Sequence, residues 1–248
     1  MALDQTAASA PRASIPARLA MAAQAVVALV AAAQLISYLA QAALADRIAS
    51  GIAESPFVYE ANDERVRALM LTQVGVRLLA SLLFLIWLHR AVTSARRLSD
   101  DVTLPTPGEA VAAFFIPFIN LVRPVLVISR LHAAVDPEKL PAVVRVIDDP
   151  AAGYRAPARR IEVLEWRRIT APVGVWWALY LLPILEGFFI GRVGAPASTL
   201  ASDSRVAALF AVARVLGAVL GALVVVAIER RLGELGRRRE AQGASQGR

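Results

Sequence analysis

The feature that most constrains this chain is a set of four apolar runs, each bounded by charged residues. They cover residues 19–45, 68–88, 171–191 and 206–228. A helix needs about 20 predominantly apolar residues to cross the roughly 30 Å hydrocarbon core of a bilayer, and each run reaches that length. Hydrophobic residues make up 57% of the chain, which is a larger share than soluble domains carry. The sequence therefore predicts an all-α membrane protein with four transmembrane helices.

A further apolar stretch, residues 108–134, lies between the second and third runs and is interrupted by Pro117, Asn120, Arg123 and Pro124. Its longest apolar part, residues 110–122, is only about 13 residues, which is too short for a spanning helix and typical of a re-entrant or interfacial segment. Pro124 suits the first position of a second helical piece, because proline lacks only a donor that is unsatisfied there anyway. We expect this Pro-interrupted segment to enter and leave on the cytoplasmic side.

The distribution of basic residues predicts the topology. Twelve Lys or Arg residues fall between 90 and 168, whereas the other two loops between the runs carry five together. Basic loops remain on the cytoplasmic side of a membrane. We therefore expect both termini in the cytoplasm of a bacterial inner (cytoplasmic) membrane. The domain organisation is a disordered head (1–18), a four-span membrane domain (19–229) and a disordered basic tail (230–248).

The strongly basic balance, a formal charge of +7, has two interpretations. On a soluble chain it would indicate nucleic acid as a partner. Here the basic residues flank apolar runs and act as the topology signal, so we expect no nucleic-acid partner. A cleavable signal peptide is the alternative interpretation of residues 19–45, but a signal peptide's apolar region runs about 7–15 residues and this run is longer.

Three ionisable residues lie inside the predicted spans: Arg77, Glu186 and Arg214. Charges in the bilayer are costly, so such residues usually pair and face the bundle interior. Counting from the span ends places all three in the outer half, and we expect a cluster that ties the second, third and fourth spans together. The alternative is that each arginine extends separately to the outer headgroups. Glycine pairs four apart predict close helix packing; they are Gly187 with Gly191 and Gly217 with Gly221.

Three short motifs resemble those of a bacterial membrane family known as domain of unknown function 4328. They are WLHR at 87–90, IPFINLVRP at 116–124 and VWWALYL at 175–181. The family-motif positions are Trp87, Arg90, Pro117, Asn120, Leu121, Pro124, Trp176 and Trp177. The resemblance implies a span that ends in an aromatic–Arg signature, a Pro–x–x–Asn–Leu segment and a span with two adjacent tryptophans. The family has no assigned activity, so the resemblance implies no mechanism.

The residues that carry chemistry are few. The chain has no metalloprotease, serine-hydrolase or phosphate-loop motif. His132 and Asp136 are four apart and are two potential metal ligands, but two ligands do not make a site. Asn120, Arg123 and Arg130 are candidates for contact with lipid headgroups, and their alternative role is to anchor a re-entrant turn. We expect no cofactor, no metal and no catalytic residue.

Two functions from different classes follow. The first is a non-enzymatic helical bundle with an envelope, regulatory or scaffold role, in contact with the lipid bilayer and with anionic lipid at the cytoplasmic face. The alternative is a subunit of an oligomeric small-solute transporter or channel that uses Arg77, Glu186 and Arg214. A homo-oligomer and a separate membrane partner both remain open.

Overall fold

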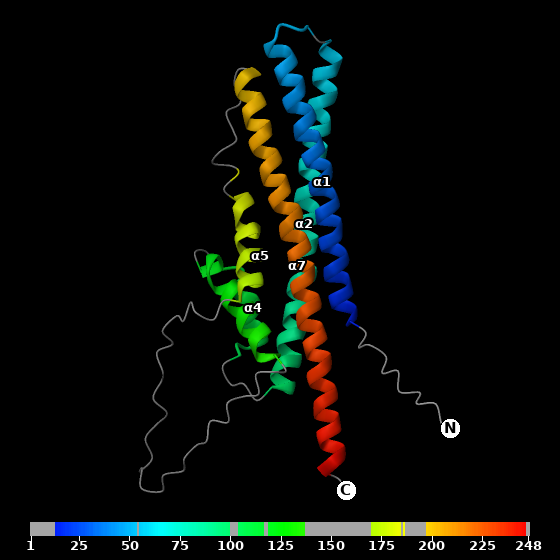
Figure 1. Ribbon diagram of the computed structural model, residues 1–248, viewed down its shortest axis with the longest axis vertical. Coiled ribbons are helices and arrows are strands. Elements are labelled where there is room, and N and C mark those ends of the chain that lie inside the picture. Colours follow the sequence, from blue (N-terminus) through cyan, green and yellow to red (C-terminus); the bar gives the residue numbers. More distant parts are fainter. Residues whose placement is uncertain are drawn as a thin grey trace, which may run out of the picture.

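The structure is a computed structural model that describes residues 13–53, 55–99, 104–116, 119–136, 170–184, 186 and 197–246. The regular elements in these residues are all helices, and none of these residues belongs to a β-strand. Three long helices, α1, α2 and α7, lie side by side, and the shorter helices α4 and α5 pack on one flank of them (Figure 1).

Helix α1 (Ile15–Ala49) extends beyond the predicted span of residues 19–45 at both ends, and residues 15–18 are helical where a disordered head was expected. The Ser14 side chain accepts a hydrogen bond from the backbone N–H of Ala17, and a proline occupies the first turn, both of which favour a helix start. The helix ends before Gly51, whose φ of 83° lies in the left-handed region that glycine adopts readily. Its 35 residues extend about 52 Å at ~1.5 Å per residue, which exceeds the hydrocarbon thickness.

Helices α2 (Pro56–Leu98) and α7 (Ala197–Gln246) are longer still. All three long helices are long and apolar enough to cross a membrane. Many of their large apolar side chains are exposed, as expected of surfaces that face lipid; examples are Leu29, Leu78 and Leu209. The protein is therefore an all-helical membrane protein with three candidate membrane-spanning helices in the described residues.

The long helices extend beyond the apolar runs that predict them. Helix α2 already begins at Pro56, where the sequence indicates a polar loop. The basic tail, expected to be disordered after residue 229, is instead helical as far as Gln246. Arginine, leucine and glutamate are good helix formers, and Leu232 of the tail is buried in the core. The extension also has polar partners, since Arg239 donates to the backbone carbonyl of Arg97 on α2.

The predicted third span is described only in part. Helix α5 (Ala171–Leu181) is a short apolar helix, and it tightens into a 3₁₀ turn (Leu182–Ile184) at Pro183. Proline lacks the backbone donor that would continue the α-helical ladder, so the helix ends there. Residues 185 and 187–196, which include Gly187 and Gly191, lie outside the described residues, as do 137–169.

The Pro-interrupted segment forms three short pieces, α3 (Pro107–Ala112), a 3₁₀ turn (Ile119–Leu121) and α4 (Arg123–Ala134). Pro124 lies in the first turn of α4, as predicted. Helix α3 begins with a capping box, in which the backbone N–H of Thr106 donates to the Glu109 carboxylate at 2.9 Å. These hydrogen bonds, from the backbone first and then from the Thr106 side chain, lower the pKa of Glu109.

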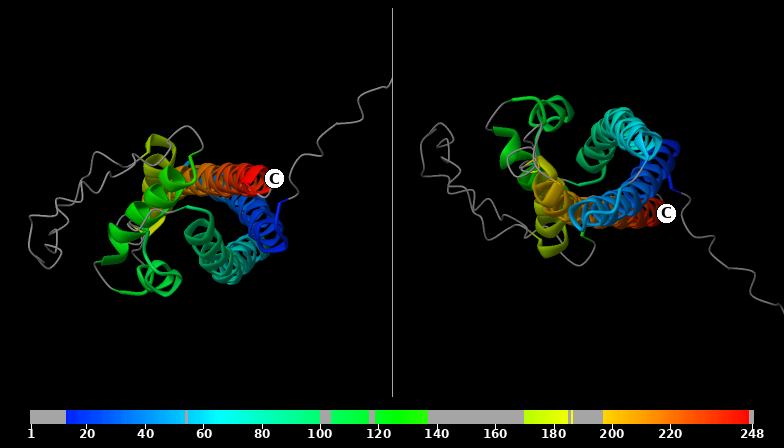
Figure 2. Two further views of the ribbon diagram at one scale, coloured as in Figure 1. Left: turned by 90° about the horizontal axis from the view of Figure 1, so that it is seen from below. Right: turned by 90° about the horizontal axis from the view of Figure 1, so that it is seen from above.

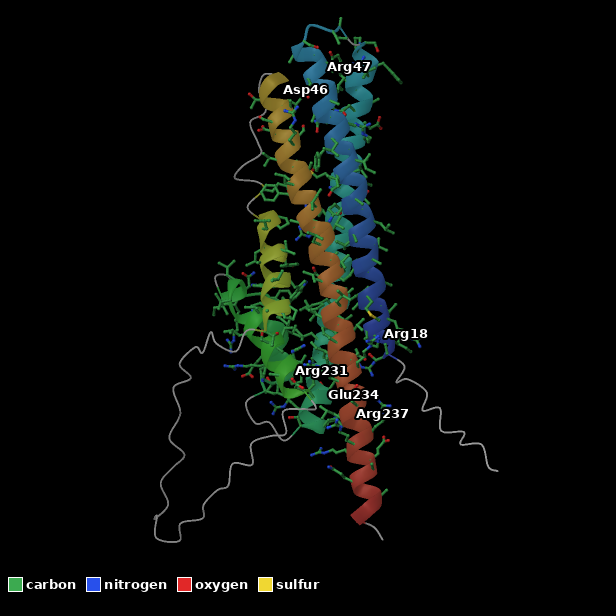
Figure 3. All side chains as sticks on the ribbon, in the orientation of Figure 1. Arg18, Asp46, Arg47, Arg231, Glu234 and Arg237 are labelled. Carbon is green, nitrogen blue, oxygen red and sulfur yellow. The ribbon has the colours of Figure 1, made fainter. Side chains whose placement is uncertain are left out.

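The two ends of the bundle differ in the charged residues and the chain segments that lie there. Asp46 and Arg47 lie at one end, where α1 turns into α2, whereas three arginines and one glutamate lie toward the other, Arg18, Arg231, Arg237 and Glu234 (Figure 3). Helices α3 and α4 belong to this second half of the molecule, close to the start of α5 (Figures 1 and 2). We refer to the two ends as the Asp46 end and the Arg231 end.

Candidate functional site

A polar cavity lies between helices α1, α2, α5 and α7, about midway along the long helices. Its volume is about 40 Å³. Its polar lining includes Gln24 of α1, Gln73 and Arg77 of α2, Tyr180 of α5 and Arg214 of α7. Ala80, Gly217 and Ala218 also line it, and these small residues leave space that larger side chains would fill. The four helices thus enclose polar groups where an apolar core would be expected.

Arg214 is held by two polar groups from other parts of the chain. Its guanidinium forms an ion pair with Glu186, and both side chains are largely buried, with 10% and 15% of their surface exposed. Arg214 also donates to the side-chain oxygen of Gln34 on α1 at 3.2 Å. Its Nε has no hydrogen-bond partner. The pair joins α7 to the residues that follow α5.

Arg77 lines the same cavity but contacts a different group. Its Cζ lies 5.6 Å from the centre of the Tyr180 ring, within the range of a cation–π interaction. Among the described residues no carboxylate lies within ion-pair distance of it. The structure therefore brings Arg214 and Glu186 together as a pair, and it places Arg77 against an aromatic ring instead of in a three-residue ion cluster.

Gln73 is a cavity residue whose two side-chain polar atoms both lack a hydrogen-bond partner among the described residues. It lies one helical turn before Arg77, and only 4% of its surface is exposed. Neither its amide nitrogen nor its amide oxygen has a hydrogen-bond partner in the described structure. Buried polar groups are normally paired, so such a residue calls for an explanation. The spacing of Gln73, Arg77 and Ser81 indicates from sequence that they share a face, but it does not show that Gln73 lacks a partner.

The glycines of α7 allow α5 to approach closely. A Cβ added at Gly217 would lie 3.5 Å from the Leu179 Cβ, and one added at Gly221 would lie 2.8 Å from the indole nitrogen of Trp176. The second distance is shorter than real Cβ contacts, so Gly221 accommodates the tryptophan ring. This close packing agrees with the prediction from the four-residue glycine spacing, and it holds Trp176 at the cavity wall.

The family-motif residues that are described make contacts between helices. Trp87 is fully buried, and its indole N–H donates to Glu229 of α7 at 2.9 Å. Trp177 donates to the backbone carbonyl of Leu121 at 2.7 Å, so α5 is tied to the Pro-interrupted segment. Pro124 is buried, Asn120 is half-buried and Arg90 is exposed; Pro117 lies outside the described residues.

Glu229 is a structural residue that sequence reasoning missed. Besides Trp87, it accepts a hydrogen bond from the backbone N–H of Ser14 at 3.1 Å. A carboxylate at a helix N-terminus is favoured by the free N–H groups and by the helix dipole. Glu229 thus joins α7, α2 and the start of α1. The only signal in the sequence is an acidic residue directly after an apolar run, which does not identify its partners.

The candidate headgroup residues lie in the Pro-interrupted segment. Arg123 is exposed at the start of α4, and Arg130 is half-buried on the same helix. His132 and Asp136 face Arg231 of α7, whose Nη1 donates to the His132 carbonyl at 3.0 Å and lies 3.7 Å from the Asp136 carboxylate. The described part of the chain gathers no group of three residues that could hold a metal ion.

These features define an all-helical membrane protein whose helices are held together by buried tryptophans, close glycine contacts and a largely buried ion pair. Residues 50–231 match the model of the family described as Domain of unknown function (DUF4328), and the chain belongs to that family. No curated protein and no solved structure matches the chain. The family thus fixes the class of the protein without supplying an activity.

Proposed function

We propose that the protein is a non-enzymatic four-span bundle of the bacterial inner membrane with an envelope, regulatory or scaffold role. The observation that carries this proposal is the asymmetry of the two ends. The Arg231 end gathers the basic part of α7, the start of α1 and the Pro-interrupted segment (Figure 3). Basic residues remain on the cytoplasmic side, so this end faces the cytoplasm and both termini lie there.

The position of α5 supports a fourth span. It packs along α7 through Gly217 and Gly221, and it starts in the half of the bundle that contains α4, whereas α7 starts near the Asp46 end (Figure 1). Helix α5 therefore runs toward the Asp46 end (Figure 1). Val175 and Leu182 on this path are exposed apolar residues, which suits a surface in lipid.

The Pro-interrupted segment supplies a surface for anionic lipid. Asn120 and Arg123 lie where the 3₁₀ turn meets α4, and Arg130 follows two turns later. Cationic side chains near the cytoplasmic leaflet are attracted by its negative surface potential, by about 1 kcal/mol per residue. This surface would fix the height of the bundle in the membrane and present the basic extension of α7 to a partner or to a second copy.

Topology mapping tests the proposal. The chain contains no cysteine, so single cysteines need no prior replacement. Cysteines at Gly108, where no atom crowds an added Cβ, and at Ala134 should both react from the cytoplasmic side only. Reporter fusions after Arg248 and after Ala53 should give cytoplasmic and periplasmic signals respectively. A periplasmic C-terminus would refute the four-span arrangement.

Lipid specificity supplies a second test. In detergent, phosphatidylglycerol should raise the melting temperature more than phosphatidylcholine does, and Arg123→Gln should reduce that difference. Arg67→Gln is the matched control, because Arg67 is also exposed but lies on the part of α2 near the Asp46 end. Equal effects of the two lipids, or equal losses in the two variants, would contradict a headgroup role for Arg123.

One observation favours the second candidate function, a subunit of an oligomeric small-solute transporter or channel. The cavity beside Arg77 contains a buried amide with no partner, Gln73. A cysteine at Ser81, which lines the cavity, should react with a small water-soluble thiol reagent if the cavity belongs to an aqueous path. A cysteine at the lipid-exposed Leu78 is the control. Equal lack of reaction at both positions would favour the scaffold role.

A further inference from the structure

The cavity between α1, α2, α5 and α7 carries more positive than negative charge. Arg214 is neutralised by Glu186. Arg77 contacts the Tyr180 ring, which carries no net charge, and no described carboxylate lies within ion-pair distance of it. Charged residues inside a membrane usually pair. The described cavity is therefore one negative charge short.

The same space also contains two buried hydrogen-bond donors that have no partner in the described part of the chain, beside one unpartnered acceptor, the amide oxygen of Gln73. The amide nitrogen of Gln73 and the Nε of Arg214 are buried and have no partner. Both residues line the cavity together with Arg77, and guanidinium groups only donate. Donors from α2 and α7 thus meet at one cavity, and an acceptor that carries negative charge would satisfy them.

The size of the cavity limits what the acceptor is. To hold one water molecule, a cavity needs about 10–15 Å³ of volume open to the centre of a water-sized sphere. This cavity has about 40 Å³ of such volume. That is room for one monatomic ion with a water or two. Trp176 and Leu179 also line the space and make part of its wall apolar.

We propose that the cavity binds a monovalent inorganic anion of the size of chloride. Arg77 supplies the opposing charge, the amide nitrogen of Gln73 donates a hydrogen bond, and the Nε of Arg214 adds a second donor. A co-bound water satisfies the amide oxygen of Gln73. The anion would stabilise the bundle whether the protein is a scaffold or a transporter, so this site goes beyond both functions.

The test uses the full chain purified in a non-ionic detergent and exchanged into sodium gluconate. Sodium chloride then replaces gluconate at constant ionic strength, while the melting temperature and the chloride NMR linewidth are measured. We expect a saturable rise in melting temperature and an excess linewidth that bromide reverses. Arg77→Gln and Gln73→Leu should each weaken the apparent chloride affinity by about tenfold or more, roughly the loss of one hydrogen bond to a charged group.

Two comparisons separate binding from general damage to the fold. In chloride-free buffer Arg77→Gln should melt no lower than the wild-type protein, because it removes an unpaired intramembrane charge. Arg67→Gln, on an exposed position of the same helix, should keep the full response to chloride. The absence of a chloride-dependent shift, or an unchanged shift in Arg77→Gln, would overturn the proposal. A phosphatidylglycerol shift that Arg77→Gln abolishes, with none from chloride, would overturn it too, since the cavity would then take a lipid phosphate.

Discussion

Replacing Glu186 with glutamine tests the ion pair between Glu186 and Arg214 at nearly constant side-chain volume. The substitution leaves Arg214 charged and largely buried, with the 3.2 Å hydrogen bond to Gln34 and the interaction with Tyr38 among its remaining polar contacts. Removing one partner of a buried pair costs about 3–5 kcal/mol, because the other charge is left uncompensated. We expect a cost near the lower value, about 3 kcal/mol. Both side chains are partly exposed, and Arg214 keeps its contact with the Gln34 amide, so the stranded charge is partly compensated.

Thermal unfolding in detergent measures this loss. For a chain of this size 1 kcal/mol corresponds to roughly 2–4 °C, so Glu186→Gln should lower the melting temperature by about 6–12 °C. Adding Arg214→Gln should recover at least half of the loss, because no charge is then stranded. Adding Arg77→Gln should recover much less, since Arg77 contacts the Tyr180 ring. A neutral Glu186→Gln, or equal recovery by the two arginine variants, would refute the pairing.

Three further outcomes are expected elsewhere in the fold. Gly221→Ala should destabilise the protein by about 1–3 kcal/mol through overpacking against α5, whereas Gly75→Ala, where nothing crowds the added carbon, should be neutral or stabilising in the same melt. Trp87→Phe should cost about 1–3 kcal/mol because Glu229 loses its indole donor, and an unchanged melting temperature would contradict this reason. An NMR titration should give Glu109 a pKa below the ordinary glutamate value; the capping contribution to stability is then present above the ordinary pKa and is lost as pH falls through the lowered one.

Particular residues show where sequence reasoning succeeded. The place of Pro124 in the first turn of α4 follows from local capping rules. Gly217 and Gly221 face α5, as their spacing predicts. Each of these features depends on a few neighbouring residues, so the local sequence is enough to predict it.

The sequence by itself therefore determined the membrane class, the helical secondary structure and the presence of costly charges at residues 77, 186 and 214, because length, hydropathy and periodicity are local properties. Only the tertiary structure decided that Arg214 pairs with Glu186 while Arg77 lies over Tyr180, since a charge in an apolar run does not specify which neighbour it meets. The same holds for the contacts of Glu229 and for the helical tail. Their stabilising partners are more than a hundred residues away in sequence, and only packing of the long helices brings those partners together.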